Sequence, residues 1–312
     1  MDALSRPFIP DLRNFSFTTT SCHVARYPLF CPLRSGQTYA KRTGIRYPRV
    51  AHRRLPTLTA ISLTNGLREA ESILLWLGIG AAEQLLLTWM IQMLKDVDAQ
   101  GRLSVIQFTR AEDRDMEVWG LGLLNPEQIK RRPTEEHLAV EAVSELEHCW
   151  AAVTSADPAQ FLSLLSEDSA RFPFLRPSLQ PLLGRYPDHQ MGINRWGVEL
   201  LKYVKEKGPR VASVIGYTIG YKCDADQVGD AYLFSRLRRL ADPALPFPLL
   251  TLSGDSTTMR GCEVALTEAG AAVLAGRANA VKLNGIDDWV LGVHLDSAHG
   301  SVWYREDGAV VA

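Results

Sequence analysis

The sequence predicts an α/β plus α+β protein, in which a domain with a partial parallel sheet is followed by a winged-helix-like domain. The first domain is predicted by a strand, a glycine turn, a helix and a second strand within residues 72–108. This is the size expected of a βαβ unit, whose parallel strands form an α/β layer. The second is predicted by three helices, a hairpin and a fourth helix within residues 192–276. This is the order of elements in a winged helix.

The chain divides into four parts by composition and pattern. Its 312 residues, 46% of them hydrophobic, suffice for two domains with buried cores. The expected parts are a basic, disordered extension over 1–60, the α/β domain over 61–170, a proline-rich bridge over 171–191 and the winged-helix-like domain over 192–312.

The extension carries much of the positive charge of the chain. Residues 1–54 hold ten basic and two acidic residues, net +8, whereas the remainder holds 24 basic and 33 acidic residues, net −9. The segment is rich in Ser, Thr and Pro and has no sustained period, so we expect it to be irregular. A non-folding extension is the favoured interpretation, and a transit peptide or a nucleic-acid-binding arm are the alternatives.

Short apolar runs and glycines define the α/β domain. Ser72–Leu77 predicts an interior strand, and Gly78–Gly80 predicts a tight turn after it. Ala81–Lys95 predicts a helix that is apolar on most sides and therefore packs against a sheet. Leu103–Phe108 predicts the next strand.

Capping residues mark most of the later helices. In the first domain and the bridge we expect a helix from Asn125-Pro126 to Lys130, a helix capped by Thr134 that ends near Val153, a helix from Asp157-Pro158, and short helical pieces within Arg171–Pro187. In the second domain we expect helices from Asn194 to Lys207, over Val211–Ile219, over Ala231–Ala241 with Asp230 as cap, and over Thr267–Ala275, and strands over Phe247–Leu252 and Cys262–Leu266.

Composition favours a cytoplasmic protein that does not enter a membrane. The apolar stretch from Ile73 to Leu94 is interrupted by Glu83 and Gln84, which favours a buried strand and helix over a membrane span. Five widely spaced cysteines without a C-x-x-C pair are typical of a reducing compartment. The formal net charge of −1 excludes a chain that coats nucleic acid by global charge.

The third helix of the winged-helix-like domain carries the candidate DNA contacts. Leu233, Leu237 and Leu240 form one stripe, and arginines lie on the opposite face or its flank. The planar guanidinium group pairs bidentately with phosphate and guanine edges. The candidate residues are Arg236, Arg238 and Arg239 in the helix and Arg260 in the hairpin.

Two observations weigh against this hypothesis. Residues 192–262 carry a net charge of only +3, well short of a strong basic stripe. Asp224, Asp226 and Asp230 lie just before the helix and would repel phosphate. A solvated helix face in a domain that packs against protein is therefore the alternative interpretation.

A small enzyme or nucleotide-binding protein is the alternative function. Gly78-x-Gly80-x-x-Glu83 follows a strand and opens a helix, as a dinucleotide fingerprint does. Glu in the third position would crowd the turn and place negative charge near a pyrophosphate. A site at the carboxyl ends of the strands would use Glu83, Gln84, Asp287, Asp288 and His294.

No motif identifies a reaction, a metal or a cofactor. His294 and His299 do not share a helix face and have no obvious third ligand beyond Asp287 or Asp288, so structural histidines are favoured. The Asn284-Gly285 turn favours capping aspartates over paired catalytic carboxylates. A nucleophile elbow, a P-loop and an H-E-x-x-H motif are absent from the sequence. A structural or partner-binding protein or a homo-oligomer, suggested by exposed turns that contain tryptophan, is the third interpretation.

From Glu71 onward, several stretches resemble an uncharacterised bacterial family that is known only as a domain of unknown function. These stretches are LLWLGIGAAEQLLL (74–87), CWAAVTSADP (149–158), FPFLRPSLQPLLGRYP (172–187), DAYLFSRLRRLAD (230–242), LTEAGAAVLAGRANAV (266–281), NGIDDWVLGVHL (284–295) and VWYRED (302–307). The resemblance implies a Rossmann-like α/β amino-terminal part and a helical carboxy-terminal part, without an assigned reaction. The LTEAG stretch separately resembles the second wing strand and following helix of bacterial winged-helix regulators.

The chain departs from this family in two places. Members usually begin with a strand, an N-G-D-S-like turn and a tryptophan–aspartate motif, which residues 1–65 lack. Gly80 stands where the family pattern implies an acidic residue. An active site in the amino-terminal half of the family would therefore be incomplete in this chain. The resulting expectation is a bacterial binding or regulatory protein.

Overall fold

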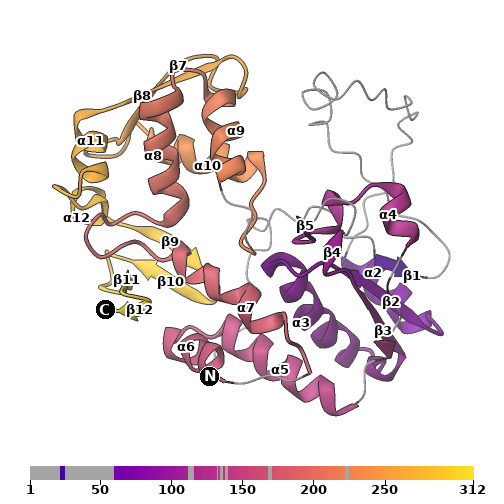
Figure 1. Ribbon diagram of the computed structural model, residues 1–312. Coiled ribbons are helices and arrows are strands. Elements are labelled where there is room, and N and C mark those ends of the chain that lie inside the picture. Colours follow the sequence, from indigo (N-terminus) through magenta and orange to yellow (C-terminus); the bar gives the residue numbers. More distant parts are fainter. Residues whose placement is uncertain are drawn as a thin grey trace.

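The computed structural model describes residues 22–24, 60–111, 116–131, 133, 136–137, 140–167, 171–221 and 225–312. Helices and strands are mixed throughout, as the sequence predicts, and most sheets have two strands (Figure 1). The expected basic extension over 1–60 lies outside the described residues except for Cys22–Val24 and Ala60. Within the described part, no helix has both the length and the apolar character needed to cross a membrane.

The first half contains a four-stranded sheet with the order β1-β2-β3-β6. Its strands, with two further short ones, are β1 (Cys22–Val24), β2 (Ile73–Leu77), β3 (Leu103–Gln107), β4 (Arg110–Ala111), β5 (Met116–Glu117) and β6 (Glu136–His137). Its helices are α2 (Ala60–Glu69), α3 (Ala81–Lys95), α4 (Pro126–Lys130), α5 (Val140–Thr154), α6 (Pro158–Ser166) and α7 (Leu175–Leu179), with 3₁₀ turns η2 (Gln100–Arg102), η4 (Leu121–Leu123) and η5 (Gln180–Arg185).

The predicted βαβ unit is confirmed. Strands β2 and β3 pair in parallel with α3 between them in the chain, and their register joins Ile73 to Leu103 and Leu77 to Gln107. Strands β1 and β6 add antiparallel edges on either side. Helix α3 is buried over most of its circumference, as the apolar sequence predicts. It packs with β2, α5 and α7 into one hydrophobic core.

The second half forms a separate hydrophobic core. Its ribbon runs from salmon through orange to yellow in Figure 1. Its elements are α8 (Arg195–Lys207), α9 (Val211–Tyr221), α10 (Asp230–Leu240), β7 (Leu250–Gly254), β8 (Cys262–Leu266), α11 (Glu268–Leu274) and α12 (Ala280–Asn284). Two hairpins follow, β9 (Asp287–Val290) with β10 (Val293–Asp296) and β11 (Tyr304–Glu306) with β12 (Ala309–Val311).

Local signals explain the helix starts of this half. Asn194 accepts a hydrogen bond from the Gly197 N–H and caps α8, and Thr267 accepts one from the Gly270 N–H and caps α11. Strands β7 and β8 form an antiparallel hairpin. The segment between α8 and α9 adds a bridge between Arg210 and Glu263, so a third short stretch joins this hairpin.

Backbone hydrogen bonds join the two halves, and in one of them the Gly292 N–H, between β9 and β10, donates to the Val153 carbonyl oxygen of α5 over 2.9 Å. Another lies at the start of α3. The Ala81 N–H, in the first turn of α3, donates to the Ala225 carbonyl oxygen in the loop before α10, over 2.8 Å. The first N–H groups of a helix have no partner within the helix. A loop of the second half therefore caps a helix of the first.

Four expectations are wrong in detail. Helix α5 begins at Val140, because the chain first forms the short strand β6, and the expected cap Thr134 lies outside the described residues. Gly229, rather than Asp230, occupies the N-cap position of α10. Asp287 and Asp288 do not cap a turn, since they lie in strand β9. Only Trp289 among the seven tryptophans is exposed, so the expectation of many exposed tryptophan turns is also wrong.

Candidate nucleic-acid interface

Helix α10 presents two different faces, as its sequence predicts. Leu233 and Leu237 are completely buried in the second core. Ser235, Arg238 and Arg239 are exposed on the other side, and Arg236 is partly buried on the flank. The hydrophobic stripe thus fixes which side of the helix the arginines occupy.

Two of these arginines are held by one carboxylate from a distant hairpin. Arg236 forms an ion pair and hydrogen bond with the Asp288 side chain of β9, and Arg239 Nη1 lies 3.2 Å from the other Asp288 oxygen. Arg239 also donates through Nη2 to the Asp287 carbonyl oxygen over 2.7 Å. The structure therefore brings together Arg236, Arg239, Asp287 and Asp288, which the sequence placed in two different hypotheses.

Asp288 is ionised in this arrangement. Burial alone would raise the pKa of its carboxyl group, but the charges of Arg236 and Arg239 and the hydrogen bonds from Arg236 and the Trp289 N–H more than offset burial. The pKa of Asp288 therefore lies below its ordinary value.

Arg238 and Arg260 remain available to a ligand. Both are exposed, and neither makes an ion pair with another residue in the described part of the chain. Burial raises the pKa of the Cys262 thiol, and Arg238 is close enough for its charge to oppose that rise. Arg238 thus lies on the side of the loop end of the β7–β8 hairpin, where Cys262 pairs with Gly254 and begins β8, and Arg260 precedes Cys262 by two residues.

The aspartates before α10 do not act as one repulsive group. Asp226 is 1% exposed and accepts hydrogen bonds from Arg185 (2.6 Å), Arg195 (3.4 Å) and Trp196 Nε1 (3.0 Å). Its charge is therefore neutralised inside the molecule. Asp230 is exposed, and Asp224 lies outside the described residues.

Arg185, Arg195 and Trp196 were not singled out from the sequence as partners of Asp226. They lie in η5 and α8, 41, 31 and 30 residues away along the chain. The ring of Tyr232 on α10 lies beside this group, with the Arg185 guanidinium 5.5 Å from its centroid. The sequence signal that could have indicated this group is Arg185 itself, a basic residue in a stretch rich in Leu and Pro.

Glu83 and Gln84 are structural residues of the β2–α3 turn. Glu83 is 4% exposed, and its carboxylate accepts hydrogen bonds from the Gly78 and Leu121 N–H groups. Gln84 is 1% exposed and donates to the Gly78 carbonyl oxygen over 2.9 Å. Both side chains satisfy buried backbone groups rather than face a ligand.

The glycine turn packs closely against the backbone of residues 118–120. The Ile79 N–H donates to the Val118 carbonyl oxygen, and a Cβ atom at Gly80 would overlap the carbonyl oxygen of Trp119. The backbone of residues 118–120 therefore lies directly against the glycines that a dinucleotide fingerprint keeps open for a pyrophosphate. Glycine is needed here for close packing of the chain against itself.

The two candidate histidines have different partners. His294 Nε2 lies 2.8 Å from Asp287 Oδ1, and its ring stacks on Trp289 with centroids 4.4 Å apart. His299 pairs instead with Asp296. Among the described residues no cluster of three or more His, Cys, Asp or Glu side chains could hold a metal ion. The His294 side chain thus contacts its own hairpin, whereas the Glu83 side chain contacts the backbone around the β2–α3 turn.

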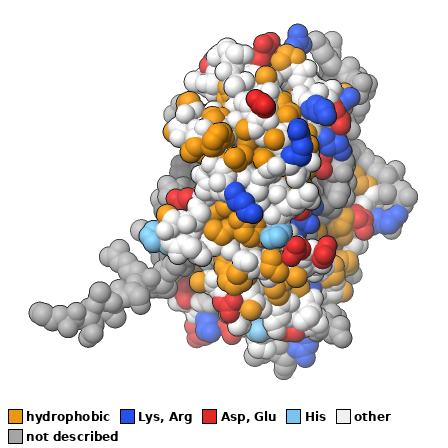
Figure 2. All heavy atoms as spheres, turned by 90° about the vertical axis from the view of Figure 1, so that its left-hand side faces the viewer, with side chains coloured by type: hydrophobic (Ala, Val, Ile, Leu, Met, Phe, Trp, Pro, Cys, Tyr) orange, Lys and Arg blue, Asp and Glu red, His pale blue; other side chains and the backbone are white. Residues whose placement is uncertain are grey.

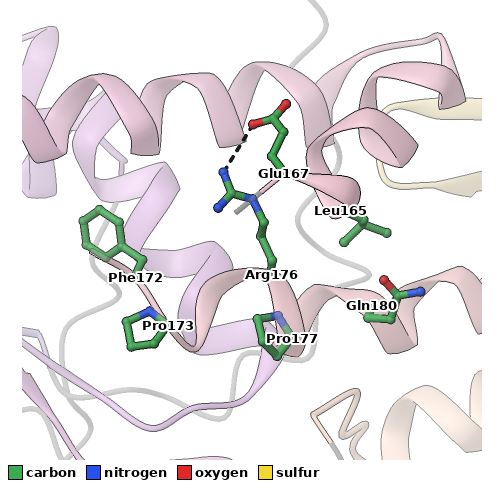
Figure 3. A pocket seen from close by; sticks show the side chains of 7 residues that line it. All are labelled: Leu165, Glu167, Phe172, Pro173, Arg176, Pro177 and Gln180. Atoms are coloured by element: carbon green, nitrogen blue, oxygen red, sulfur yellow. Dashed lines mark hydrogen bonds and ion pairs between the residues drawn. The ribbon is translucent and has the colours of Figure 1, made fainter. Parts of the chain in front are cut away.

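A pocket of about 380 Å³ lies beside α7, away from these residues (Figure 3). Its walls include Phe172, Pro173 and Pro177, and its polar part includes Arg176 and Glu167. Arg176 Nη2 is 3.3 Å from Glu167, its Nη1 is 3.5 Å from Glu145, and its Nε donates to the Leu164 carbonyl oxygen. The guanidinium group is thus neutralised by the protein and ties α7 to α5 and α6.

The surface charge on the face drawn in Figure 2 is divided. Lys and Arg side chains lie there in separate groups among hydrophobic and acidic ones, rather than in one continuous basic stripe. This agrees with the small positive excess of residues 192–262. A comparison of the chain with protein-family models finds no match, and a comparison with curated proteins finds none.

Proposed function

We propose that residues 192–276 form a winged helix that binds double-stranded DNA, with α10 as the recognition helix and the β7–β8 hairpin as the wing. The order of α8, α9, α10, β7, β8 and α11 supports this proposal. The bridge between Arg210 and Glu263 adds support, because the short first strand of a winged helix lies between its first two helices. The hydrophobic core that these elements share supports it as well.

One observation carries the proposal. Arg238 on α10 and Arg260 beside β8 are exposed cations without an ion-pair partner in the described chain, and Arg238 lies on the side of the loop end of the hairpin that carries Arg260. A recognition helix and a wing contact one stretch of duplex in this way. Guanidinium groups are suited to phosphate and to the O6 and N7 atoms of guanine.

The competing enzyme function has less support. Its strand-end residues Glu83 and Gln84 are committed to the backbone of the turn, and residues 118–120 fill the space beside the glycines. Asp287 and His294 lie on a surface hairpin instead. A regulatory role through DNA therefore remains our proposal, in a protein expected to be cytoplasmic.

The test is the salt dependence of binding to a mixed-sequence DNA duplex, measured by fluorescence anisotropy. Each phosphate contact contributes about 0.9 to the slope of log K against log salt. Arg238→Ala and Arg260→Ala should each reduce the magnitude of the slope by about 1 if they contact phosphates. Arg131→Ala removes an exposed cation at the end of α4 and is the matched control.

Two results would contradict the proposal. One is that both the wild-type protein and the Asp288→Asn variant fail to bind DNA at low salt. The other is binding whose slope is the same in the wild type and in a variant that lacks both Arg238 and Arg260.

A further inference from the structure

We propose that the β9–β10 hairpin masks helix α10, with Asp288 as a built-in competitor for the DNA phosphate. This inference rests on the proposed DNA-binding function and concerns the regulation of the same site. It is carried by the juxtaposition of Arg236 and Arg239 with a carboxylate that lies about fifty residues away in the chain.

The contact resembles the one that these arginines would make with DNA. A carboxylate and a phosphate both accept charge-assisted hydrogen bonds from guanidinium groups. Asp288 uses one oxygen for Arg236 and the other for Arg239. The two side chains of the inner pair are largely shielded, with 19% of Arg236 and 18% of Asp288 exposed. Arg236 is therefore shielded from a phosphate while this arrangement persists, and Arg239, whose side chain is 52% exposed, has donors of both terminal nitrogens engaged by the hairpin.

The hairpin also places further negative charge beside the helix. The Asp287 side chain is 84% exposed, and its backbone carbonyl accepts a hydrogen bond from Arg239. The Trp289 N–H donates to Asp288 Oδ1 over 3.0 Å and fixes the carboxylate. A DNA backbone that approaches α10 therefore meets the exposed Asp287 carboxylate beside the helix, and Coulomb repulsion opposes its binding.

The hairpin has an anchor that does not depend on this contact. Val290, Val293 and Leu295 are buried with Tyr186 in a small core of their own. The α10 arginines meet the hairpin through its carboxylate and carbonyl oxygens instead. A phosphate can therefore displace Asp288 from the arginines without disrupting the apolar packing that holds the hairpin.

The decisive variant is Asp288→Asn, which keeps the size of the side chain and removes its charge. Each arginine that is freed to bind a phosphate should raise the DNA affinity by roughly tenfold at about 0.1 M salt, and the salt slope should steepen by about 1 to 2. Asp296→Asn is the matched control, because it removes a carboxylate of similar exposure from the partner strand, where it binds His299. Arg236→Gln in the Asp288→Asn background should cancel the roughly tenfold share of Arg236 and leave that of Arg239.

The outcomes separate this inference from the proposed function. If the wild type binds DNA and Asp288→Asn binds it no more tightly than Asp296→Asn does, the masking role is overturned and the DNA-binding function stands. Failure of the wild type to bind, together with tight binding by Asp288→Asn, would support both. Failure of both proteins to bind would overturn both. If Asp288→Asn does not fold, Asp288→Ser should give the same increase in DNA affinity. A folded Asp288→Ser protein without this increase would count against masking.

Discussion

The buried carboxylate of Asp226 gives the most direct test of the structure. The change is Asp226→Asn, which keeps the shape of the side chain and removes its charge. Arg185 and Arg195, whose side chains are each 17% exposed, then lose their shared counter-ion. The Asn amide has a single acceptor oxygen, so it replaces either Oδ1, which binds Arg185, or Oδ2, which binds Arg195 and Trp196 Nε1, and the effect includes the loss of one of these hydrogen-bond acceptors.

The expected cost follows from the burial of the group. Removal of one partner from a buried ion pair typically costs about 3–5 kcal/mol, because the remaining charge is left without compensation. We expect the lower end of this range, about 3 kcal/mol, since Arg195 also donates to the Asp226 carbonyl oxygen, which the substitution leaves in place.

The assay is urea unfolding at pH 7, followed by tryptophan fluorescence. A lower midpoint with an unchanged m-value would indicate a loss of stability without a change in the denatured state. Asp230→Asn is the control, because Asp230 is exposed and its carboxylate accepts a hydrogen bond from the neighbouring Ala231 N–H, so its cost should stay near about 0.5 kcal/mol. If Asp226→Asn lowers the free energy of unfolding no more than this control does, the ion pairs of Asp226 with Arg185 and Arg195 do not stabilise the second core, and our reasoning fails.

Two further predictions concern the glycine turn and the hairpin contact. Gly80→Ala should destabilise the protein by about 2 kcal/mol or more, because its Cβ would overlap the Trp119 carbonyl oxygen. A Cβ at Gly216 would meet no atom within 4 Å, so Gly216→Ala should instead stabilise its exposed helix by about 0.5–1 kcal/mol. Thermal unfolding of both variants checks that the two changes in stability have opposite signs. The Asp288 pKa is lower in the folded than in the unfolded state, where it is about 3.9, so its stabilising contribution is complete above about pH 5 and is lost as the pH falls through the folded pKa. The difference in urea midpoint between the wild type and Asp288→Asn should therefore shrink between pH 7 and pH 3, and a difference that is constant with pH would refute this linkage.

The sequence predicts well those features that depend on neighbouring residues. The apolar run of β2, the Gly78–Gly80 turn and the side-chain caps of α8 and α11 are all local signals, and each element is observed. The leucine stripe likewise assigned the buried and exposed faces of α10 correctly. In these cases backbone geometry or helical period determines the outcome within a few residues.

Features that depend on distant pairing were missed. Strand β6 has two residues, and the terminal hairpins have strands of three or four, which is too short for a reliable alternating pattern. The partnership of Asp288 with Arg236 joins residues 52 apart, so no period or spacing could indicate it. Glu83 was taken as a candidate ligand residue because a sequence does not reveal which backbone N–H groups will need an acceptor.

The hydrogen bond between Ala81 and Ala225 has a consequence for how the molecule unfolds. A helix whose first turn is capped by another unit frays when that unit melts, and Asp226, the next residue in the loop, holds the side chains of η5 and α8. The two hydrophobic cores are therefore coupled energetically, although each has its own packing. We expect loss of the second core to loosen the start of α3, which would make heat denaturation more cooperative than that of two independent domains.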